Sequence, residues 1–191
     1  IIGASGGIGS ALQTAYSKNN IFGVINTLTR SKDSFDIRDE NSVTRALENQ
    51  DYLYDVVIIA TGCIEINNNG PEKTIKKLSA NNMIEQFSLN AVGPALILKH
   101  IHKLIPKSQS SHVIILSARV GSISDNRLGG WISYRTAKAA LNQIVRTSAI
   151  EIKRTHPKAC LLAVHPGTVD TNMTKNYTSH AKVLSLIHIS E

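Results

Sequence analysis

The chain has 191 residues, of which 42% are hydrophobic and 18% charged, so it is long and apolar enough to bury one sizeable core. Lysine and arginine number 21 against 14 acidic residues, which gives a net charge of +7. The basic residues are spread along segments such as KTIKKL and EIKRTHPK, without interleaved aromatic residues, so we interpret them as a solvated surface and expect no nucleic-acid partner.

The two cysteines, Cys63 and Cys160, fit no metal-ligand spacing and are too few for a disulfide framework. We therefore expect two buried thiols, no metal site and a reducing compartment. No apolar run reaches about 18 residues and no signal segment opens the chain, so we expect no membrane association and a cytoplasmic location. Because the first residues read as the middle of a strand, an exported precursor remains an open alternative.

Apolar runs alternate with amphipathic segments along nearly the whole chain, a pattern typical of a parallel sheet covered by helices. The runs are rich in Val, Ile and Leu, as expected for strands buried on both faces. We predict about six strands, over residues 1–4, 22–29, 34–37, 54–60, 112–118 and 160–166. We predict helices over residues 6–18, about 40–49, 73 to about 103, and 131–155. The fold class is therefore α/β, a doubly wound parallel sheet with helices on both faces.

The segment GASGGIGS places Gly3, Gly7 and Gly9 directly after the first predicted strand and at the start of the first predicted helix. Glycines there let the backbone turn tightly and approach a pyrophosphate, whose charge meets free N–H groups and the positive end of the helix. This spacing is GxxxGxG and differs from the common GxGxxG. The segment predicts a Rossmann-type dinucleotide site, and a turn that serves packing alone is the alternative.

The residues at the end of the second predicted strand distinguish NAD(H) from NADP(H). Here they are Arg30 and Ser31, and neither is a carboxylate. A guanidinium can hold a phosphate with two hydrogen bonds, so we predict NADP(H) over NAD(H), with an exposed loop arginine as the alternative. Asp36 ends the third predicted strand and is placed to accept from an adenine amino group. Its alternative is a helix N-cap, a role that Asp39 or Asn41 can also fill.

Tyr134 and Lys138 lie four residues apart in a helical pattern, so their side chains share one face, one turn from each other. A tyrosine with a pKa near 10 is a poor base at neutral pH, but a nearby ammonium favours the phenolate and lowers that pKa. The pair therefore predicts proton exchange with a carbonyl or alcohol oxygen. Tyrosine and lysine at this spacing also occur on ordinary solvated helix faces.

Two polar residues complete the predicted catalytic set. Ser117 ends the fifth predicted strand, at the carboxyl edge where ligands bind, and can hold a substrate oxygen beside Tyr134. Its alternative is a bond to the local backbone. Asn90 lies in SLNAVGPALIL and is predicted to organise a water chain to Lys138, or else to satisfy a backbone kinked before Pro94.

These motifs together resemble the short-chain dehydrogenase/reductase family from Ile1 to about Asn176. The resemblance implies that Tyr134 is the acid/base and that Lys138 also holds the nicotinamide ribose. It further implies that Ser117 positions the substrate and that Asn90 supports the proton relay. The stretch HPGTVDT resembles the family's Pro-Gly segment, which implies that Thr171, with Thr168 and Val169 nearby, contacts the nicotinamide carboxamide.

The resemblance implies a set of cofactor-binding residues: Gly3, Ser5, Gly7, Ile8, Gly9, Arg30, Ser31, Asp36, Ile37, Ala60, Thr61, Gly62, Tyr134, Lys138, Pro166, Gly167, Val169 and Thr171. Within the family, the segments ATG, GGWISYRTAK and HPGTVDT are most similar to the C-factor-like subgroup, named for a bacterial cell-to-cell signalling protein.

The sequence also departs from the family pattern. Residues 59–62 read IATG where the family usually has Asn-Asn-Ala-Gly, and SISDNRLGG predicts a longer loop over the substrate pocket. We expect an incomplete family domain over residues 1–176, cut at both ends, and an irregular tail over 177–191 that does not resemble the family and is open to a non-native origin.

We expect hydride transfer between the nicotinamide and a small carbonyl or secondary-alcohol substrate. The resemblance implies a homodimer or homotetramer for the full-length protein. The alternative is an NADP(H)-binding signalling or sensor protein with little turnover. Sugar-nucleotide epimerases share the Tyr and Lys pair but normally differ in glycine spacing.

Overall fold

The computed structural model describes residues 1–177 and contains a parallel sheet of three strands in the order β1-β2-β3. The strands are β1 (Val56–Ile59), β2 (Ser111–Leu116) and β3 (Ala159–Val164). In their register Ile58 pairs with Ile114, and Ile114 pairs with Leu162. The aliphatic runs that predicted these strands are therefore the centre of the sheet.

Two further segments join the sheet through single bridges. Ile2 forms parallel bridges with both Leu28 and Ile59, so the segments around Ile2 and Leu28 continue the order beyond β1. The prediction of about six strands is thus too high for the described residues. Residues 34–37 form no strand, because the Asp36 N–H donates to the Ser42 hydroxyl at 3.0 Å in place of a ladder bond.

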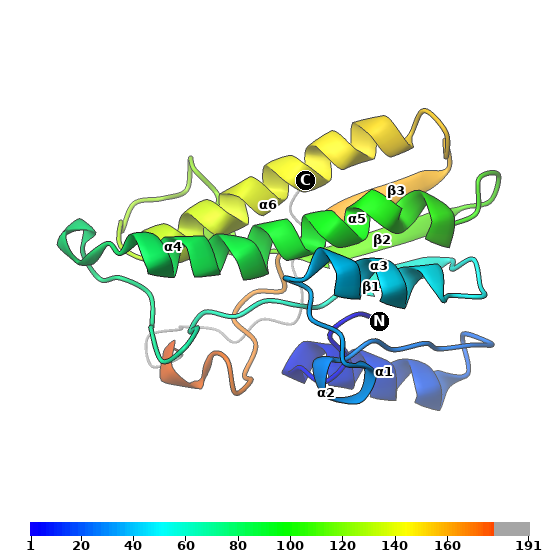
Figure 1. Ribbon diagram of the computed structural model, residues 1–191, viewed down its shortest axis with the longest axis horizontal. Coiled ribbons are helices and arrows are strands. Elements are labelled where there is room, and N and C mark those ends of the chain that lie inside the picture. Colours follow the sequence, from blue (N-terminus) through cyan, green and yellow to red (C-terminus); the bar gives the residue numbers. More distant parts are fainter. Residues whose placement is uncertain (178–191) are drawn as a thin grey trace.

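The helices follow the predicted alternation with strands. They are α1 (Gly7–Asn19), α2 (Arg30–Asp33), α3 (Glu40–Glu48), α4 (Ala80–Phe87), α5 (Gly93–Leu104) and α6 (Ile132–Ile152), with short 3-10 turns at Ile75–Lys77, Arg119–Gly121 and Lys175–Tyr177. Figure 1 shows α3, α5 and α6 side by side along the strands, with α1 and α2 apart from that row.

The predicted helix from residue 73 to about 103 is wrong in two respects. The α-helix begins only after Ser79, whose side chain accepts from the Asn82 N–H. It is then interrupted by a π-helical turn, Ser88–Val92, before α5 starts. Pro94 lacks an N–H and its ring clashes with the carbonyl four residues back, so the chain widens there. A single π-turn inside an α-helix is often found at functional sites, and this one contains Asn90.

The core lies between the row of helices and the sheet. Each fully buried Ile or Leu in it contributes about 1.5–3 kcal/mol. Its fully buried members include Val43, Ile59, Ile97, Ile101, Val113 and Leu141. Because the strands are parallel, the residues that follow them gather at one edge of the sheet. Within residues 1–177, every helix is too short or too polar to span a lipid bilayer.

Residues 178–191, nearly all of the predicted tail, lie outside the described residues. Tyr177, which we placed in that tail, ends a 3-10 turn and packs its ring edge-on against Trp131 at 5.1 Å between centroids.

Candidate active site

The glycine turn has the geometry of an anion site. Gly3 has a φ of +88°, and a Cβ there would lie 2.9 Å from the Ala60 oxygen. A Cβ on Gly9 would lie 2.3 Å from the Gly3 oxygen, so α1 packs directly against the turn. The N-cap of α1 is Gly6, which offers no capping side chain, and the first turn holds no acid. The positive end of α1 is therefore open to an anionic ligand. Around it Ser5 and Gly7 are exposed and Ile8 is half-buried.

The segment after β3 folds over this turn. A Cβ on Gly7 would lie 2.7 Å from Thr171 Cγ2, which places Thr171 at the start of α1. Gly167 has a φ of +77°, and its N–H donates to His165 Nδ1 at 3.0 Å. The Thr171 N–H donates to the Thr174 hydroxyl at 3.0 Å. Pro166, Thr168 and Val169 lie half-buried in the same segment.

The segment after β1 lies beside the glycine turn through Ala60 and Thr61. The Thr61 methyl is 3.0 Å from a Cβ built on Gly3. The Thr61 hydroxyl is buried and has no hydrogen-bond partner within the described part of the chain. Gly62 has a φ of +148°, a conformation that side-chain-bearing residues rarely adopt.

Asn90 is fully buried and binds the backbone of Cys63. Its Oδ1 accepts from the Cys63 N–H at 3.1 Å, and its Nδ2 donates to the Cys63 oxygen at 3.0 Å and to Gln86 Oε1 at 2.7 Å. The Asn90 amide therefore satisfies the backbone of the loop after β1, and its bonds do not go to the helix backbone before Pro94. Its Oδ1 and Lys138 Nζ both lie near Gly62.

Tyr134 and Lys138 are both buried, one turn apart on α6. Lys138 Nζ donates to the Leu116 oxygen at 3.0 Å and lies 5.9 Å from the centre of the Tyr134 ring. Burial lowers the pKa of Lys138 to about 8. Burial raises the pKa of Tyr134, although we expected Lys138 to lower it. The loss of hydration on burial sets the direction of this pKa shift.

Ser117 directly follows β2 and is nearly buried. Its hydroxyl donates to Asn142 Oδ1 at 2.6 Å. Asn142 was missed by the sequence analysis, although its position four residues after Lys138 places it on the same face of α6. The side chains of Tyr134, Lys138 and Asn142 therefore form a row along α6, with Ser117 at one end of it.

The short segment after Leu28 carries basic side chains and one carboxylate. Arg30 and Ser31 are exposed at the start of α2. The Asp33 carboxylate accepts from the Thr29 N–H at 2.7 Å, so a carboxylate does stand here, contrary to expectation.

Asp36 lies close by and binds Arg38. Its carboxylate accepts from Arg38 Nε at 3.1 Å and from Nη2 at 2.8 Å. The hydrogen bonds from Arg38 hold the pKa of Asp36 below its usual value, and the charge of Arg30 adds to this effect. Asp39, not Asp36, is the N-cap of α3. Ile37 is buried in the core.

Cys160 is exposed and Cys63 only half-buried, so the prediction of two buried thiols is wrong. Cys160 lies at a position of β3 that faces away from the core. In the loop before α6, Ile123 and Leu128 are open to solvent, at 86% and 92% exposure.

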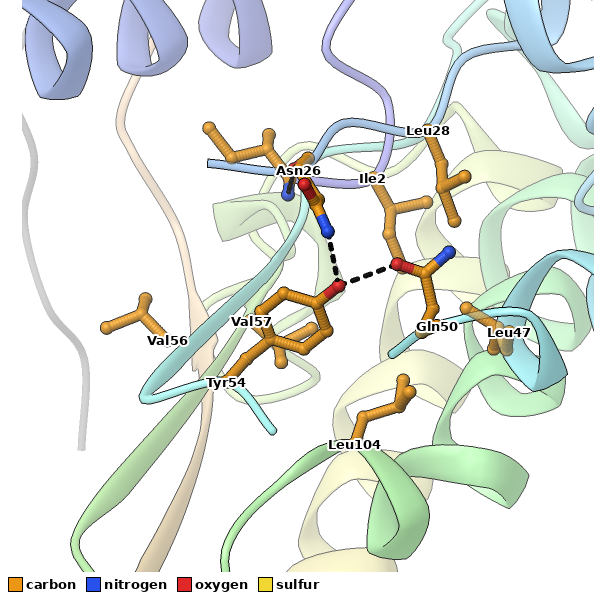
Figure 2. Close-up of a pocket in the computed structure, with 10 residues that line it drawn as sticks. Ile2, Asn26, Leu28, Leu47, Gln50, Tyr54, Val56, Val57 and Leu104 are labelled. Carbon is orange, nitrogen blue, oxygen red and sulfur yellow. Dashed lines mark hydrogen bonds between the residues drawn. The ribbon is translucent and has the colours of Figure 1, made fainter. Parts of the chain in front are cut away.

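Two cavities lie elsewhere. One of about 40 Å³ is lined by Asn26, Gln50 and Tyr54 among apolar side chains, and Figure 2 shows the Tyr54 hydroxyl between Asn26 and Gln50. The second, of about 290 Å³, lies beside it. Both include Val56, the first residue of β1, so they open at the sheet edge opposite Tyr134 and contain none of the predicted site residues.

Known proteins are similar to this chain in sequence and in fold. The chain is 34% identical over 92 residues to 1-hydroxy-2-glutathionyl-2-methyl-3-butene dehydrogenase of Rhodococcus sp. strain AD45, covering 48% of this chain and 39% of the relative. It is 33% identical over 92 residues to C-signal of Myxococcus xanthus, covering 48% and 54%. The chain thus spans about half or less of these two relatives' lengths.

The fold matches a short-chain dehydrogenase/reductase from Burkholderia multivorans with bound NADP, at a TM-score of 0.75 and 23% identity, covering 96% of this chain and 83% of that one. At this identity the match shows the fold alone. The family model for short chain dehydrogenases matches residues 31–182, most of the sequence. The chain therefore belongs to the short chain dehydrogenase family.

Proposed function

We propose that this protein is an NADP(H)-dependent oxidoreductase that acts on a carbonyl or secondary-alcohol group. The residues present fit a dinucleotide, because the start of α1 has no capping side chain and Gly6 and Gly7 there are exposed. The unpartnered Thr61 hydroxyl offers a further hydrogen bond beside the turn. The Burkholderia neighbour, which holds NADP, supports the same cofactor class.

In the proposed mechanism Tyr134 exchanges a proton with the substrate oxygen. When bound, the nicotinamide supplies or accepts the hydride. Ser117 holds the substrate oxygen after its hydroxyl turns from Asn142, and Lys138 binds the ribose hydroxyls and stabilises the Tyr134 phenolate as the proton leaves. Asn90 keeps the Cys63 backbone in place and links Lys138 to solvent through water.

One observation carries this proposal: Asn90 and Lys138, from different helices, converge on Gly62, while Tyr134 lies one turn from Lys138. Sequence spacing alone leaves the Tyr and Lys pair open to a surface interpretation. Burial of both side chains at the carboxyl edge of the sheet supports the catalytic interpretation over that alternative.

The test measures NADPH oxidation with a panel of small aldehydes and ketones, comparing the wild-type protein with Tyr134→Phe. Loss of the acid/base group lowers kcat by about 100- to 10,000-fold. The Kd for NADPH, measured by nucleotide fluorescence, stays close to wild type because the glycine turn is unchanged. Equal rates in the two proteins would exclude the role given to Tyr134.

The second candidate is an NADP(H)-binding signalling protein with little turnover. The similarity to C-signal supports it. Both candidates predict NADPH binding, so the fluorescence titration does not separate them. Binding without oxidation of NADPH across the panel favours the signalling protein.

A further inference from the structure

The helix that carries Tyr134 begins without a cap of its own. The residue before α6 is Trp131, which has a left-handed φ of +55° and offers no side-chain bond to the helix. The first turn of α6 also holds no acidic residue. The free N–H groups at this end therefore need acceptors from elsewhere in the chain.

Glu72, in the loop between β1 and α4, supplies these acceptors. Its backbone oxygen accepts from the Trp131 N–H at 2.5 Å, and its Oε2 accepts from the Ser133 N–H at 3.2 Å. Its Oε1 accepts from the Ser133 hydroxyl and from Asn82 Nδ2, the latter at 2.8 Å. One residue thus binds the start of α6 and, through Asn82, α4.

The carboxylate of Glu72 is buried yet charged. Only 6% of the residue is exposed, and Ser133 is fully buried. Burial tends to raise the pKa of Glu72, but the hydrogen bonds from Ser133 and Asn82 outweigh it and leave that pKa below its usual value. A negative charge at the amino end of a helix is further stabilised by the helix dipole.

Tyr134 is the third residue of α6 and directly follows Ser133, so its place depends on this first turn. The Trp131 ring also packs edge-on against the Tyr134 ring, at 6.3 Å between centroids. We propose that Glu72 is a positioning residue that fixes the first turn of α6, and with it the hydroxyl of Tyr134. The catalytic consequence rests on the proposed function, whereas the structural one does not.

The structural test uses Trp131, the one tryptophan in the sequence, as a reporter. In Glu72→Ala the first turn of α6 loosens, so Trp131 emission moves to longer wavelength and acrylamide quenching increases. The matched control is Glu48→Ala, since Glu48 is exposed on α3 and its ion pair with Lys103 is a long one, at 3.7 Å. The control keeps the wild-type emission.

The catalytic test separates kcat from the KM for NADPH. A displaced Tyr134 hydroxyl lowers kcat by about 10- to 100-fold in Glu72→Ala. The KM for NADPH changes little, because Glu72 does not contact the glycine turn. Glu72→Gln keeps one acceptor oxygen and restores part of both kcat and the Trp131 emission.

Ser133→Ala removes only a hydroxyl. Should Glu72→Ala fail to fold, this variant still tests whether the contact between Glu72 and Ser133 fixes the first turn of α6. It shifts Trp131 emission in the same direction. The double variant lowers kcat no further than Glu72→Ala alone, since the Ser133 hydroxyl acts through the carboxylate that Glu72→Ala already removes. Wild-type Trp131 emission in both single variants would overturn the inference. A wild-type protein that never oxidises NADPH would refute the proposed function while leaving the fluorescence result to decide the role of Glu72.

Discussion

Asn90 and Lys138 meet at Gly62. Asn90 Oδ1 lies 3.0 Å, and Lys138 Nζ 3.3 Å, from the position that a Cβ on Gly62 would occupy. The asparagine comes from a π-turn between α4 and α5, and the lysine from α6. A residue without a side chain therefore brings together two groups of the proposed proton path.

Gly62→Ala tests this relationship. The new methyl group meets Asn90, which is held by the Cys63 backbone, and the φ of +148° disfavours any side chain. We expect the free energy of unfolding to fall by about 1–3 kcal/mol in urea denaturation. In the control Gly23→Ala, a Cβ has nothing within 4 Å, so we expect a change below about 1 kcal/mol. Equal losses in the two variants would mean that the space at Gly62 is not restricted.

The buried Lys138 predicts a pH-dependent stability. Its pKa is lowered to about 8 by burial, so above that pH the folded chain has lost a proton that the unfolded chain keeps. The free energy of unfolding contributed by Lys138 therefore rises with pH from about 8 to 10, by at most about 1.4 kcal/mol per pH unit. Above about pH 10 the raised pKa of Tyr134 acts oppositely, since the unfolded tyrosine ionises first.

Urea denaturation of wild type and Lys138→Met across that range isolates the effect. Other titrating groups occur in both proteins and cancel in the difference. We expect the stability of wild type relative to Lys138→Met to increase between about pH 8 and 10. A difference that does not vary with pH would show that Lys138 keeps its ordinary pKa.

Arg30 predicts the preference for NADPH over NADH. A guanidinium that binds the 2′-phosphate contributes about 1.5–3 kcal/mol, so Arg30→Ala raises the KM for NADPH by about 10- to 100-fold. The KM for NADH, which lacks this phosphate, stays nearly unchanged. Lys32→Ala, an exposed cation on the same short helix, is the control. Equal effects on both nucleotides would mean that Arg30 does not recognise the phosphate.

The sequence predicts the alternation of strands and helices better than the residues at which each element begins or ends. The alternation of apolar runs indicates the parallel sheet, but it does not show that Ser42 binds the Asp36 N–H and keeps residues 34–37 out of that sheet. Likewise, the helical pattern after residue 73 does not show that Ser79 sets the start of α4. These failures come from single side-chain bonds that compete with regular backbone pairing.

In the candidate site too, the sequence predicts the local motifs but not the contacts between distant residues. Local motifs predict Tyr134, Lys138 and the glycine turn, because each depends on spacing within a few residues. Glu72 stands in a polar, turn-rich segment and acts on Ser133, 61 residues away, so no local pattern indicates it. The direction of the Tyr134 pKa also depends on burial, which the motif does not contain.

The central claim is that the glycine turn and the Tyr134 and Lys138 pair form one dinucleotide site. A crystal structure of the protein with NADP⁺ tests it most directly. We predict that the pyrophosphate lies at the start of α1, with the nicotinamide ring beside the Tyr134 hydroxyl and its ribose within hydrogen-bond reach of Lys138. A nucleotide bound elsewhere, or a nicotinamide ring pointing away from Tyr134, would contradict the account.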